Sequence, residues 1–291
     1  MIGLDVGFGW TKVAKDGQEV GKFPTWIGFW DESMEDVEPI EWEGRLYVVG
    51  EVVRYNRQRL EVADLDTLIR FLPVFVRYVR KTYNLEEEDI CGGLAPKHYT
   101  QYKADERIRR KLGEVYKLVV PQGVGVLSDV NGEINRGELV LVLDIGFNTV
   151  DFVLAKKRED GSYEKYGIGT LEGLGVQRAI ELFTNKLPTQ LELLRNFSLS
   201  RLVESFERGY ALIEGEKISL KSYIEFAIDE YADLLMTRLK AQLKDRIEER
   251  DRLFLAGGGA NLLPESIFGK DARKVQKPEF SNARGFSKIS P

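Results

Sequence analysis

Two related stretches decide the fold: "LDVGFGWTKVA", residues 4–14, and its echo "LDIGFNTVDFV", residues 143–153. In both, an apolar run ends in an aspartate, Asp5 or Asp144, and a glycine and a phenylalanine follow at the same spacing. The echo begins about half the chain after the original. Repetition at this distance predicts two related halves rather than one continuous core.

The same strand pattern opens both halves. A short buried strand leads into a glycine turn, an alternating strand, a second turn and a third strand, which predicts a three-stranded meander. Helix-like and strand-like segments then alternate, so each half is expected to be mixed α/β. Helices are expected near 66–83, 102–112, 175–183 and 222–249, and further strands at 89–94, 117–120 and 252–256. Pro73 should kink the first helix or start it, and Phe226 and Tyr231 should share the buried face of the long one.

The bulk composition describes a globular protein. The chain has 291 residues, 43% apolar and 31% charged, enough for two domains of ordinary size. The net charge of −5 argues against broad contact with nucleic acid or an anionic membrane. No apolar run approaches the roughly 20 residues that span a bilayer, and "MIGLDVG" has no secretory character. We therefore expect a cytoplasmic protein, and many Glu, Lys and Arg beside few Cys and Met suggest a thermophilic source.

Histidine and cysteine each occur once, as His98 and Cys91. A multi-histidine metal site and a thiolate zinc cluster are therefore excluded. A serine triad would have to use His98, and no serine near it resembles a nucleophile elbow. We expect His98 in a surface loop.

The paired glycine turns suggest a grip on an oligophosphate. Backbone N–H groups can donate to phosphate oxygens where no side chain blocks the approach, which explains the glycines. Asp5 and Asp144 would repel phosphate, so a Mg²⁺ ion that keeps part of its water shell is expected between them. Lys12 would add positive charge against the terminal phosphates.

Two further stretches extend this hypothesis. In "RLFLAGGGANLL" a buried strand runs into Gly257–Gly259, where a flat ligand or a phosphate can lie on the backbone. The stretch lacks the Gly-Lys-Ser/Thr of a P-loop, and "DVGFGWTK" lacks the third glycine of a Rossmann turn. In "VVPQGVGVL" Gln122 follows Pro121 at an expected helix start, and its amide can orient water for in-line attack on a γ-phosphate.

Together these motifs resemble the actin-like ATPase superfamily, which includes actin, heat-shock chaperone ATPases and sugar kinases. "LDVGFGWTK" and "LDIGFNTVDF" resemble its two phosphate motifs, "FLAGGGANLL" its adenosine motif and "VVPQGVGVLSDVNG" its connecting helix. "GGLAPKHYTQ", "VVPQGVGVL" and "PEFSNARGFSK" resemble the ParM-type plasmid-segregation actins and their archaeal relatives. Ala95 departs from the family's Gly-Leu-Pro, and Gln122 stands where ParM has glutamate.

The resemblance implies the duplicated actin/heat-shock-chaperone/sugar-kinase fold, with ATP or ADP and Mg²⁺ in an interdomain cleft. Domain I would comprise residues 1–136 and 271–291, with a C-terminal helix that packs back on it, and domain II residues 137–270. Catalytic roles would fall to Gln122, which positions water, and to Asp5 and Asp144, which hold the metal through water with help from Asp151. The nucleotide would be held by Gly7, Phe8, Gly9, Trp10 and Lys12 on one side, by Gly146, Phe147, Asn148 and Thr149 on the other, by Gly173 or Gly175 near the ribose, and by Gly257, Gly258 and Gly259 at the adenosine.

The resemblance also implies an activity: ATP hydrolysis that controls assembly into filaments, for plasmid or DNA segregation or as a cytoskeleton. The partners would be further copies of the chain and an adaptor protein bound to DNA, with no direct nucleic-acid or membrane contact. One alternative is a small-molecule kinase, which needs a carboxylate base and a sugar-site motif that is not evident. Another is a non-polymerising, nucleotide-regulated scaffold; no amphipathic tail supports its membrane-anchor version.

Overall fold

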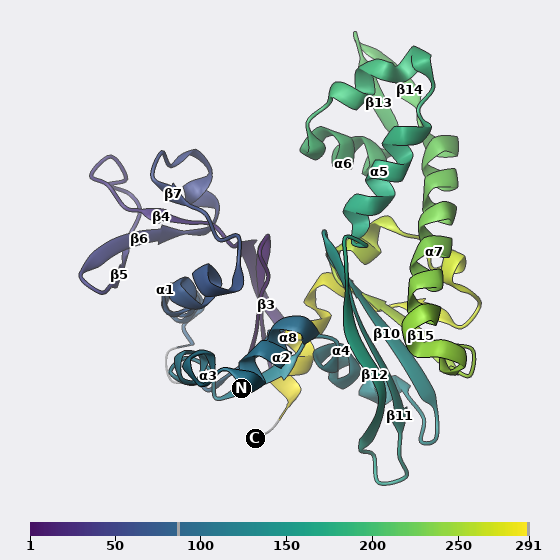
Figure 1. Cartoon of the computed structure of the whole chain (residues 1–291). Helices are drawn as coiled ribbons and strands as arrows, with labels where there is room; N and C mark the ends of the chain where they lie inside the picture. The colour runs from purple at the N-terminus through teal and green to yellow at the C-terminus, as the bar shows by residue number, and fades with distance from the viewer. Residues whose placement is uncertain (86–87, 290–291) are drawn as a thin grey trace. The chain divides into compact units, whose positions relative to one another are not determined.

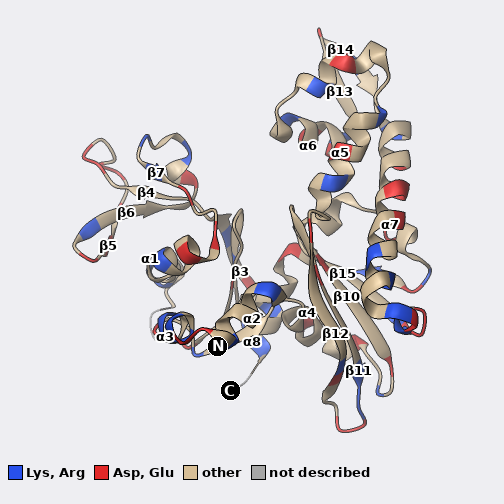
Figure 2. Ribbon diagram, viewed as in Figure 1, with Lys and Arg blue, Asp and Glu red and all other residues tan. Residues whose placement is uncertain are grey.

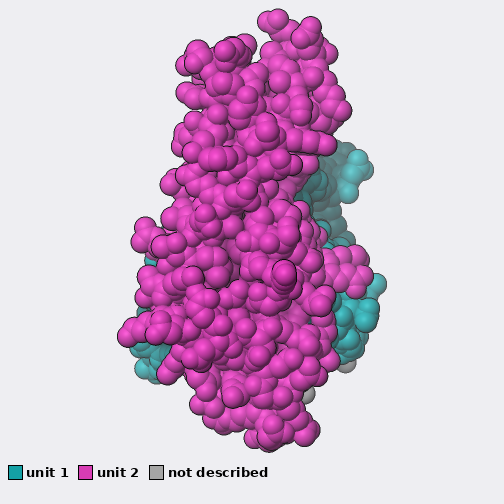
Figure 3. All heavy atoms as spheres, turned by 90° about the vertical axis from the view of Figure 1, so that its right-hand side faces the viewer, with its two compact units in different colours: residues 1–131, 280–291 teal, residues 132–279 magenta. Residues whose placement is uncertain are grey.

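A computed structural model describes residues 1–85 and 88–289 of the chain, which form two compact units. Unit 1 comprises residues 1–131 and 280–291, and unit 2 residues 132–279; Figure 3 shows them in different colours. Each unit is built around one five-stranded mixed sheet, so the predicted α/β class is confirmed (Figure 1). The domain boundaries expected at 136/137 and 270/271 stay predictions, because compactness does not show which segments fold together.

The large sheet of unit 1 has the strand order β3-β2-β1-β8-β9. Its strands are β1 (Ile2–Val6), β2 (Trp10–Lys15), β3 (Gln18–Pro24), β8 (Ile90–Leu94) and β9 (Leu118–Pro121). The first three form the expected antiparallel meander, and β8 and β9 extend the sheet in parallel beside β1. All five residues of β1 and of β8 are buried, which is typical of central strands covered on both faces.

Helix α1 (Leu65–Tyr83) follows Asp64, whose carboxylate accepts a 2.7 Å hydrogen bond from the backbone N–H of Thr67. The helix therefore begins at its cap, and Pro73 lies in its middle rather than at its start. Proline removes one helical hydrogen bond, but the apolar face of α1 is buried on both sides of it. Tertiary packing thus maintains a helix that the local sequence disfavours.

The single helix expected over 102–112 is in fact two. Helix α2 (Pro96–Ala104) and helix α3 (Glu106–Gly113) are separated by Asp105, which has extended backbone angles. The Asp105 carboxylate accepts from the N–H groups of Arg107 and Ile108, so it caps the second helix. His98 lies in the first turn of α2 rather than in a loop, and its ring meets that of Phe8 edge-on at 6.2 Å.

The expected C-terminal helix is α8 (Ser281–Lys288), and it packs back on unit 1 against β1 and α4 (Val124–Asp129). The contacts involve the backbone itself. A Cβ atom added to Gly3 would lie 1.9 Å from the carbonyl oxygen of Ala283, and one added to Gly285 would lie 1.7 Å from that of Gly125. Any larger residue at these positions would force the helix away, so the two glycines allow the close packing of α8.

Unit 1 also carries a smaller antiparallel sheet that the sequence did not predict, with the order β5-β6-β4-β7. Its strands are β4 (Ile27–Phe29), β5 (Ile40–Trp42), β6 (Arg45–Val49) and β7 (Arg59–Leu60). Segments this short show no reliable alternation of apolar and polar residues. The sheet becomes visible only once its strands pair.

The large sheet of unit 2 repeats that of unit 1, with the order β12-β11-β10-β15-β16. Its strands are β10 (Leu139–Ile145), β11 (Thr149–Lys157), β12 (Tyr163–Glu172), β15 (Arg252–Ala256) and β16 (Ala272–Lys274). Strands β10–β12 form the second expected meander, and β15 and β16 follow in parallel, as β8 and β9 do in unit 1. The repetition read from two short motifs thus extends to the whole topology of both sheets.

The helices of unit 2 are α5 (Val176–Lys186), α6 (Leu199–Arg208) and α7 (Lys221–Leu243), and a hairpin of β13 (Tyr210–Ile213) and β14 (Glu216–Ser219) joins the last two. Helix α7 ends six residues before the predicted Glu249, because Lys244 takes a positive φ of 55°. Tyr231 is buried as predicted and donates to the carbonyl of Leu174 at 2.8 Å. Phe226 was wrongly assigned to the buried face: it is 58% exposed and lies under the ammonium of Lys186.

Charged residues lie mainly on the helices and loops of both units, and the central strands carry few (Figure 2). Among residues 1–85 and 88–289, no helix has both the length and the apolar character needed to cross a bilayer.

Candidate functional site

In unit 1 the candidate site begins at the hairpin turn between β1 and β2. The N–H of Gly7 donates to the carbonyl of Trp10 at 3.1 Å, which closes the turn directly after the buried strand. A Cβ atom on Gly9 would meet nothing within 4 Å, so the backbone there is open to a ligand. The neighbouring aromatics stand outward: Phe8 is 44% and Trp10 46% exposed.

Asp5 is the centre of this half of the site. It lies opposite Lys12 in the β1–β2 register, and only 4% of it is exposed. The Lys12 ammonium lies 3.3 Å from Oδ2 of Asp5, while the side-chain amide of Gln122 donates to Oδ1 at 2.7 Å. Both carboxylate oxygens thus have a partner. Asp5 thus contacts two other predicted site residues, Lys12 from the neighbouring strand and Gln122 from a distant segment.

Gln122 reaches Asp5 because the carboxyl ends of the parallel strands β1, β8 and β9 meet at one edge of the sheet. Pro121 is the last residue of β9, and α4 begins only at Val124. The helix start expected at Gln122 is therefore wrong by two residues. Gln122 lies in the connecting turn, and its N–H donates to the carbonyl of Leu94 at 2.7 Å.

The interior beside Asp5 is apolar. The ring of Tyr116 covers Gly92 of β8, where a Cβ atom would lie 2.4 Å from the ring. Burial, together with the nearby charge of Asp5, raises the pKa of Tyr116 above its ordinary value. Tyr116 therefore stays a neutral phenol beside Asp5.

Unit 2 repeats the hairpin turn between β10 and β11. The N–H of Gly146 donates to the carbonyl of Thr149 at 2.9 Å, the counterpart of the bond from Gly7. Asp144 lies opposite Asp151 in the register, so Asp151 takes the place that Lys12 has in unit 1. Asp151 is 4% exposed and accepts a 2.6 Å hydrogen bond from the hydroxyl of Thr170.

The three glycines after β15 have different surroundings. Gly257 has a φ of 83°, and a Cβ atom there would lie 2.3 Å from Oδ1 of Asp144. A Cβ atom on Gly259 would lie 2.8 Å from Cγ2 of Ile145. On Gly258 it would meet nothing closer than 4.0 Å. Close packing thus explains why Gly257 and Gly259 are glycines. No internal contact requires a glycine at Gly258.

The start of α5 is also tied to the turn. The N–H groups of Gly175, Val176 and Gln177 donate to the carbonyls of Asn148, Gly146 and Phe147 at 3.0–3.1 Å. A Cβ atom on Gly175 would lie 2.2 Å from the carbonyl oxygen of Phe147. These hydrogen bonds hold the turn in place. The close approach of Phe147 alone explains why residue 175 is a glycine. Gly173, with a φ of 68° and open surroundings, remains accessible.

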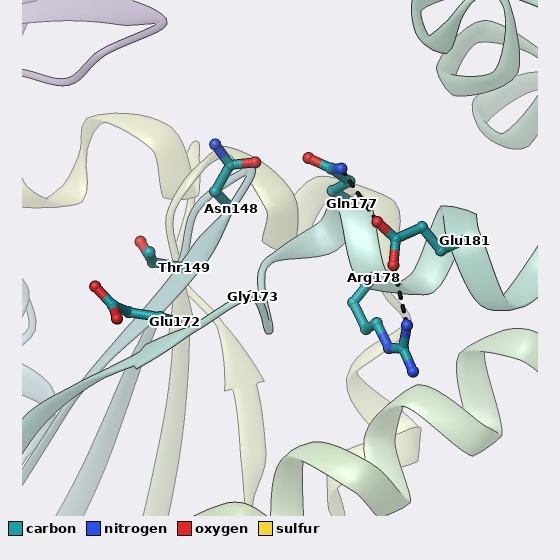
Figure 4. A pocket seen from close by; sticks show the side chains of 7 residues that line it. All are labelled: Asn148, Thr149, Glu172, Gly173, Gln177, Arg178 and Glu181. Atoms are coloured by element: carbon teal, nitrogen blue, oxygen red, sulfur yellow. Dashed lines mark hydrogen bonds and ion pairs between the residues drawn. The ribbon is translucent and has the colours of Figure 1, made fainter. Parts of the chain in front are cut away.

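A pocket of about 350 Å³ adjoins this turn in unit 2 (Figure 4). It is lined by Asn148, Thr149, Glu172, Gly173, Gln177, Arg178 and Glu181. Glu181 accepts from Gln177 at 3.1 Å and from Arg178 at 3.0 Å, so one carboxylate orders the helical side of the pocket. Sequence reasoning found the turn and Gly173 but missed Glu172 and the three residues of α5. The spacing 177, 178, 181 on one helix turn was the available signal.

The predicted site residues thus form two groups, each within its own unit. Unit 1 brings together Asp5, the turn from Gly7 to Trp10, Lys12 and Gln122. Unit 2 brings together Asp144, the turn from Gly146 to Thr149, Asp151, Gly173, Gly175 and Gly257–Gly259.

The carboxylates of the candidate site fit a magnesium ion only if they bind it through water. Within the described ranges, no group of three or more His, Cys, Asp or Glu is arranged to hold a metal ion. Both oxygens of Asp5 already contact nitrogen donors, which excludes the densely coordinated cage typical of structural metals. Carboxylates acting through water, with phosphate oxygens completing an octahedron, suit Mg²⁺. Asp5 and Asp144 fit that manner of binding.

Comparison with known proteins shows what this architecture is similar to. Residues 142–268 match the family model for the C-terminal part of the archaeal MreB-like actin homologues. No curated protein matches the sequence.

Solved structures match over nearly the whole chain. A ParM protein in a 15-stranded filament from Clostridium botulinum superposes with a TM-score of 0.72 at 18% identity, covering 98% of this chain and 97% of that one. Ta0583, an archaeal actin homologue in complex with ADP, gives 0.69 at 17% identity, with 98% and 97% covered. Bacillus thuringiensis ParM with ATP gives 0.58 at 15% identity, with 98% and 96% covered.

The duplicated sheets and the paired glycine turns thus form an actin-like fold, and the family match covers residues 142–268 of it. The fold along the whole chain is that of ParM and of the archaeal actin homologue.

Proposed function

We propose that the chain binds ATP with Mg²⁺, hydrolyses it and assembles into filaments whose stability depends on the bound nucleotide. The observation that carries the proposal is the glycine turn that follows the first strand of both large sheets, closed by the same hydrogen bond in each unit. Turns of this kind present backbone N–H groups to phosphate oxygens. Among structural neighbours, Ta0583 has been seen with ADP and a ParM with ATP.

In this proposal the phosphates contact both turns. Gly7, Phe8, Gly9 and Trp10 present their backbone on one side, and Gly146, Phe147, Asn148 and Thr149 on the other. Lys12 exchanges part of its contact with Asp5 for the terminal phosphate, because an ammonium on a four-carbon stem can reach both. Magnesium, held through water by Asp5 and Asp144, would neutralise charge on the phosphates. Asp151 supports the second turn through Thr170.

Gln122 performs the step specific to hydrolysis. Its side-chain nitrogen donates to Asp5, so its oxygen is left by that bond to accept a hydrogen bond from water. An amide is too weak a base to remove the proton, and it acts by orienting the water in line with the γ-phosphate. Asp5 therefore orients Gln122, and Gln122 orients water.

The nucleoside would occupy the pocket of unit 2. Its volume of about 350 Å³ lies within the range of small-ligand sites. Glu172 and Glu181 offer carboxylate oxygens that can accept from ribose hydroxyls. Gly173 lets the ligand approach the backbone, and Gly258 offers a bare surface for the adenosine.

Filament assembly is the finer part of the proposal. ParM from Clostridium botulinum forms a 15-stranded filament with this fold, and a head-to-tail contact that does not close produces such a polymer. We propose plasmid or DNA segregation, or a cytoskeletal role, in the cytoplasm, where ATP is supplied. The net charge of −5 favours a DNA-bound adaptor protein as the partner over DNA itself.

Sedimentation and light scattering with ATP, with ADP and without nucleotide test the proposal, with phosphate release measured in parallel. We expect pelleting with Mg-ATP, loss of the pellet as phosphate is released, and little pelleting with ADP. Hydrolysis without any pelleting would favour a non-polymerising scaffold. Transfer of phosphate to a sugar without pelleting would overturn the ATPase assignment in favour of a kinase.

A further inference from the structure

The backbone on both sides of Gln122 is fixed by hydrogen bonds from separate parts of unit 1. On one side its own N–H donates to the carbonyl of Leu94 at the end of β8. On the other, the N–H of Gly123 donates to Oδ1 of Asn282 in α8 at 3.0 Å. Two fixed peptide planes determine φ and ψ of the residue between them, and therefore the direction of its side chain.

Asn282 is firmly held. It is 4% exposed, and a Cβ atom on Gly125 would lie 2.8 Å from its Oδ1. Its helix is clamped to the far end of α4 by Asp129, which pairs with Arg284 at 2.7 Å and Lys288 at 2.9 Å. The pair of Arg284 with Asp129 is largely buried, and a buried charge pair is costly to break. The acceptor that faces Gly123 therefore cannot move unless the helix detaches.

We propose that Asn282 is a positioning residue for ATP hydrolysis, acting through the peptide that joins Gln122 to Gly123. The inference rests on the proposed role of Gln122. Without the Asn282 acceptor, the peptide after Gln122 is free to rotate, because Gly123 has a φ of 84° and tolerates many backbone conformations. The hydrogen bond from the Gln122 amide to Asp5 is then formed for a smaller fraction of the time. The attacking water is aligned less often as a result. A helix far away in sequence thus controls the alignment of the attacking water.

The test compares Asn282→Ala with a matched variant in the same helix, Ser287→Ala. The hydroxyl of Ser287 accepts a 2.8 Å bond from the N–H of Gly17, in the turn between β2 and β3, and Ser287 is 5% exposed. Ser287→Ala also removes the 2.7 Å bond that its hydroxyl donates to the carbonyl of Arg284. Each variant removes from α8 the acceptor of a backbone N–H, but only Asn282 lies beside Gln122. We expect kcat about tenfold lower for Asn282→Ala, with nucleotide affinity unchanged, and unchanged kcat for Ser287→Ala. Asn282→Asp keeps an acceptor oxygen and should retain most of the rate.

A second readout separates this inference from the proposed function. The side-chain amide of Gln122 is followed by NMR in nucleotide-free protein, its signal being assigned by its loss in Gln122→Ala. In Asn282→Ala it should shift towards the position of a solvent-exposed glutamine, and in Ser287→Ala it should stay. An unmoved signal in Asn282→Ala, or equal loss of kcat in both variants, overturns the positioning role. Absence of hydrolysis by the unmodified protein overturns the ATPase proposal instead, and the NMR comparison still decides whether Asn282 places Gln122.

Discussion

The side-chain amide of Gln122 donates a 2.7 Å hydrogen bond to the carboxylate of Asp5, a residue 117 positions earlier in the chain. The contact crosses the end of β8, which lies between β1, the strand of Asp5, and β9, the strand that Gln122 follows. It joins the residue proposed to align water to the one proposed to hold the metal. A change at either position should therefore alter the geometry of the other.

Replacing Gln122 by alanine should slow hydrolysis and leave binding intact. The variant removes the amide that aligns water but no group proposed to touch the nucleotide. We expect phosphate release to fall by between about tenfold and about a hundredfold, while the Kd for ATP changes by less than about twofold. Single-turnover phosphate release and equilibrium titration with a fluorescent nucleotide measure the two quantities. A rate equal to that of the unmodified protein would remove Gln122 from the mechanism.

Asp5→Asn should affect stability as well as activity. The substitution removes the charge that pairs with the Lys12 ammonium, whose side chain is only 16% exposed. Leaving a partly buried ammonium without its partner is expected to cost about 1–3 kcal/mol in the free energy of unfolding. Chemical denaturation measures this, and the double variant Asp5→Asn with Lys12→Met should recover part of the loss. No recovery in the double variant would mean that the ion pair is not what Asp5 contributes.

Asp144→Ala tests the metal assignment. We expect Mg²⁺-dependent hydrolysis to be abolished, because the carboxylate that would hold the ion's water on the side of unit 2 is gone. ATP affinity measured in EDTA should change little. The informative quantity is the ratio of affinities with and without Mg²⁺, which should fall towards one. Unchanged turnover would reject Asp144 as a metal-supporting residue.

Gly258→Ala and Gly259→Ala form a matched pair. The added methyl group meets nothing closer than 4.0 Å at Gly258, whereas at Gly259 it lies 2.8 Å from Ile145. Gly259→Ala should therefore lower the free energy of unfolding by about 1–3 kcal/mol. Gly258→Ala should leave stability within about 0.5 kcal/mol and weaken nucleotide binding, since the ligand is proposed to lie on that bare backbone. Binding unaffected by Gly258→Ala would place the adenosine elsewhere.

Cys91 should be inert in the folded protein. Burial raises the pKa of its thiol from an ordinary 9.0 to about 12, so at pH 8 almost none is thiolate. The folded thiol keeps its proton above pH 9 while the unfolded one loses it, so this residue lowers stability as pH rises above 9. Ellman's reagent at pH 8 should react slowly with native protein and rapidly in denaturant. Rapid labelling of the native state would show that β8 opens readily.

The parts of the site that were predictable are local and repeated. Asp5 and Asp144 each end a buried strand before a glycine, and this pattern can be read without knowing which strands pair. The contact of Gln122 with Asp5 could not be read, because it depends on the sheet order β1-β8-β9. Even the helix start beside Gln122 was misplaced, since Pro121 completes a strand.

The nucleoside pocket was less predictable than the turns. Glu181 and its neighbours on α5 resemble any charged helix surface until the turn at Gly146 is brought against them. For several glycines the sequence predicted a ligand contact that packing inside the unit already explains. Gly175, Gly257 and Gly259 look like ligand contacts in sequence, yet each has a close internal neighbour that already requires a glycine. Gly9, Gly173 and Gly258, by contrast, have surroundings that leave room for a ligand.

The packing of α8 on β1 also has a consequence for synthesis of the protein. Gly3 is made before unit 2, but the carbonyl of Ala283 that covers it emerges from the ribosome only after all of unit 2 has been made. Unit 2 is one continuous segment and can complete its core during translation. In unit 1, strand β1 cannot complete its packing until residues 281–288 have been made. The half of the molecule that is translated first is therefore the half that finishes folding last.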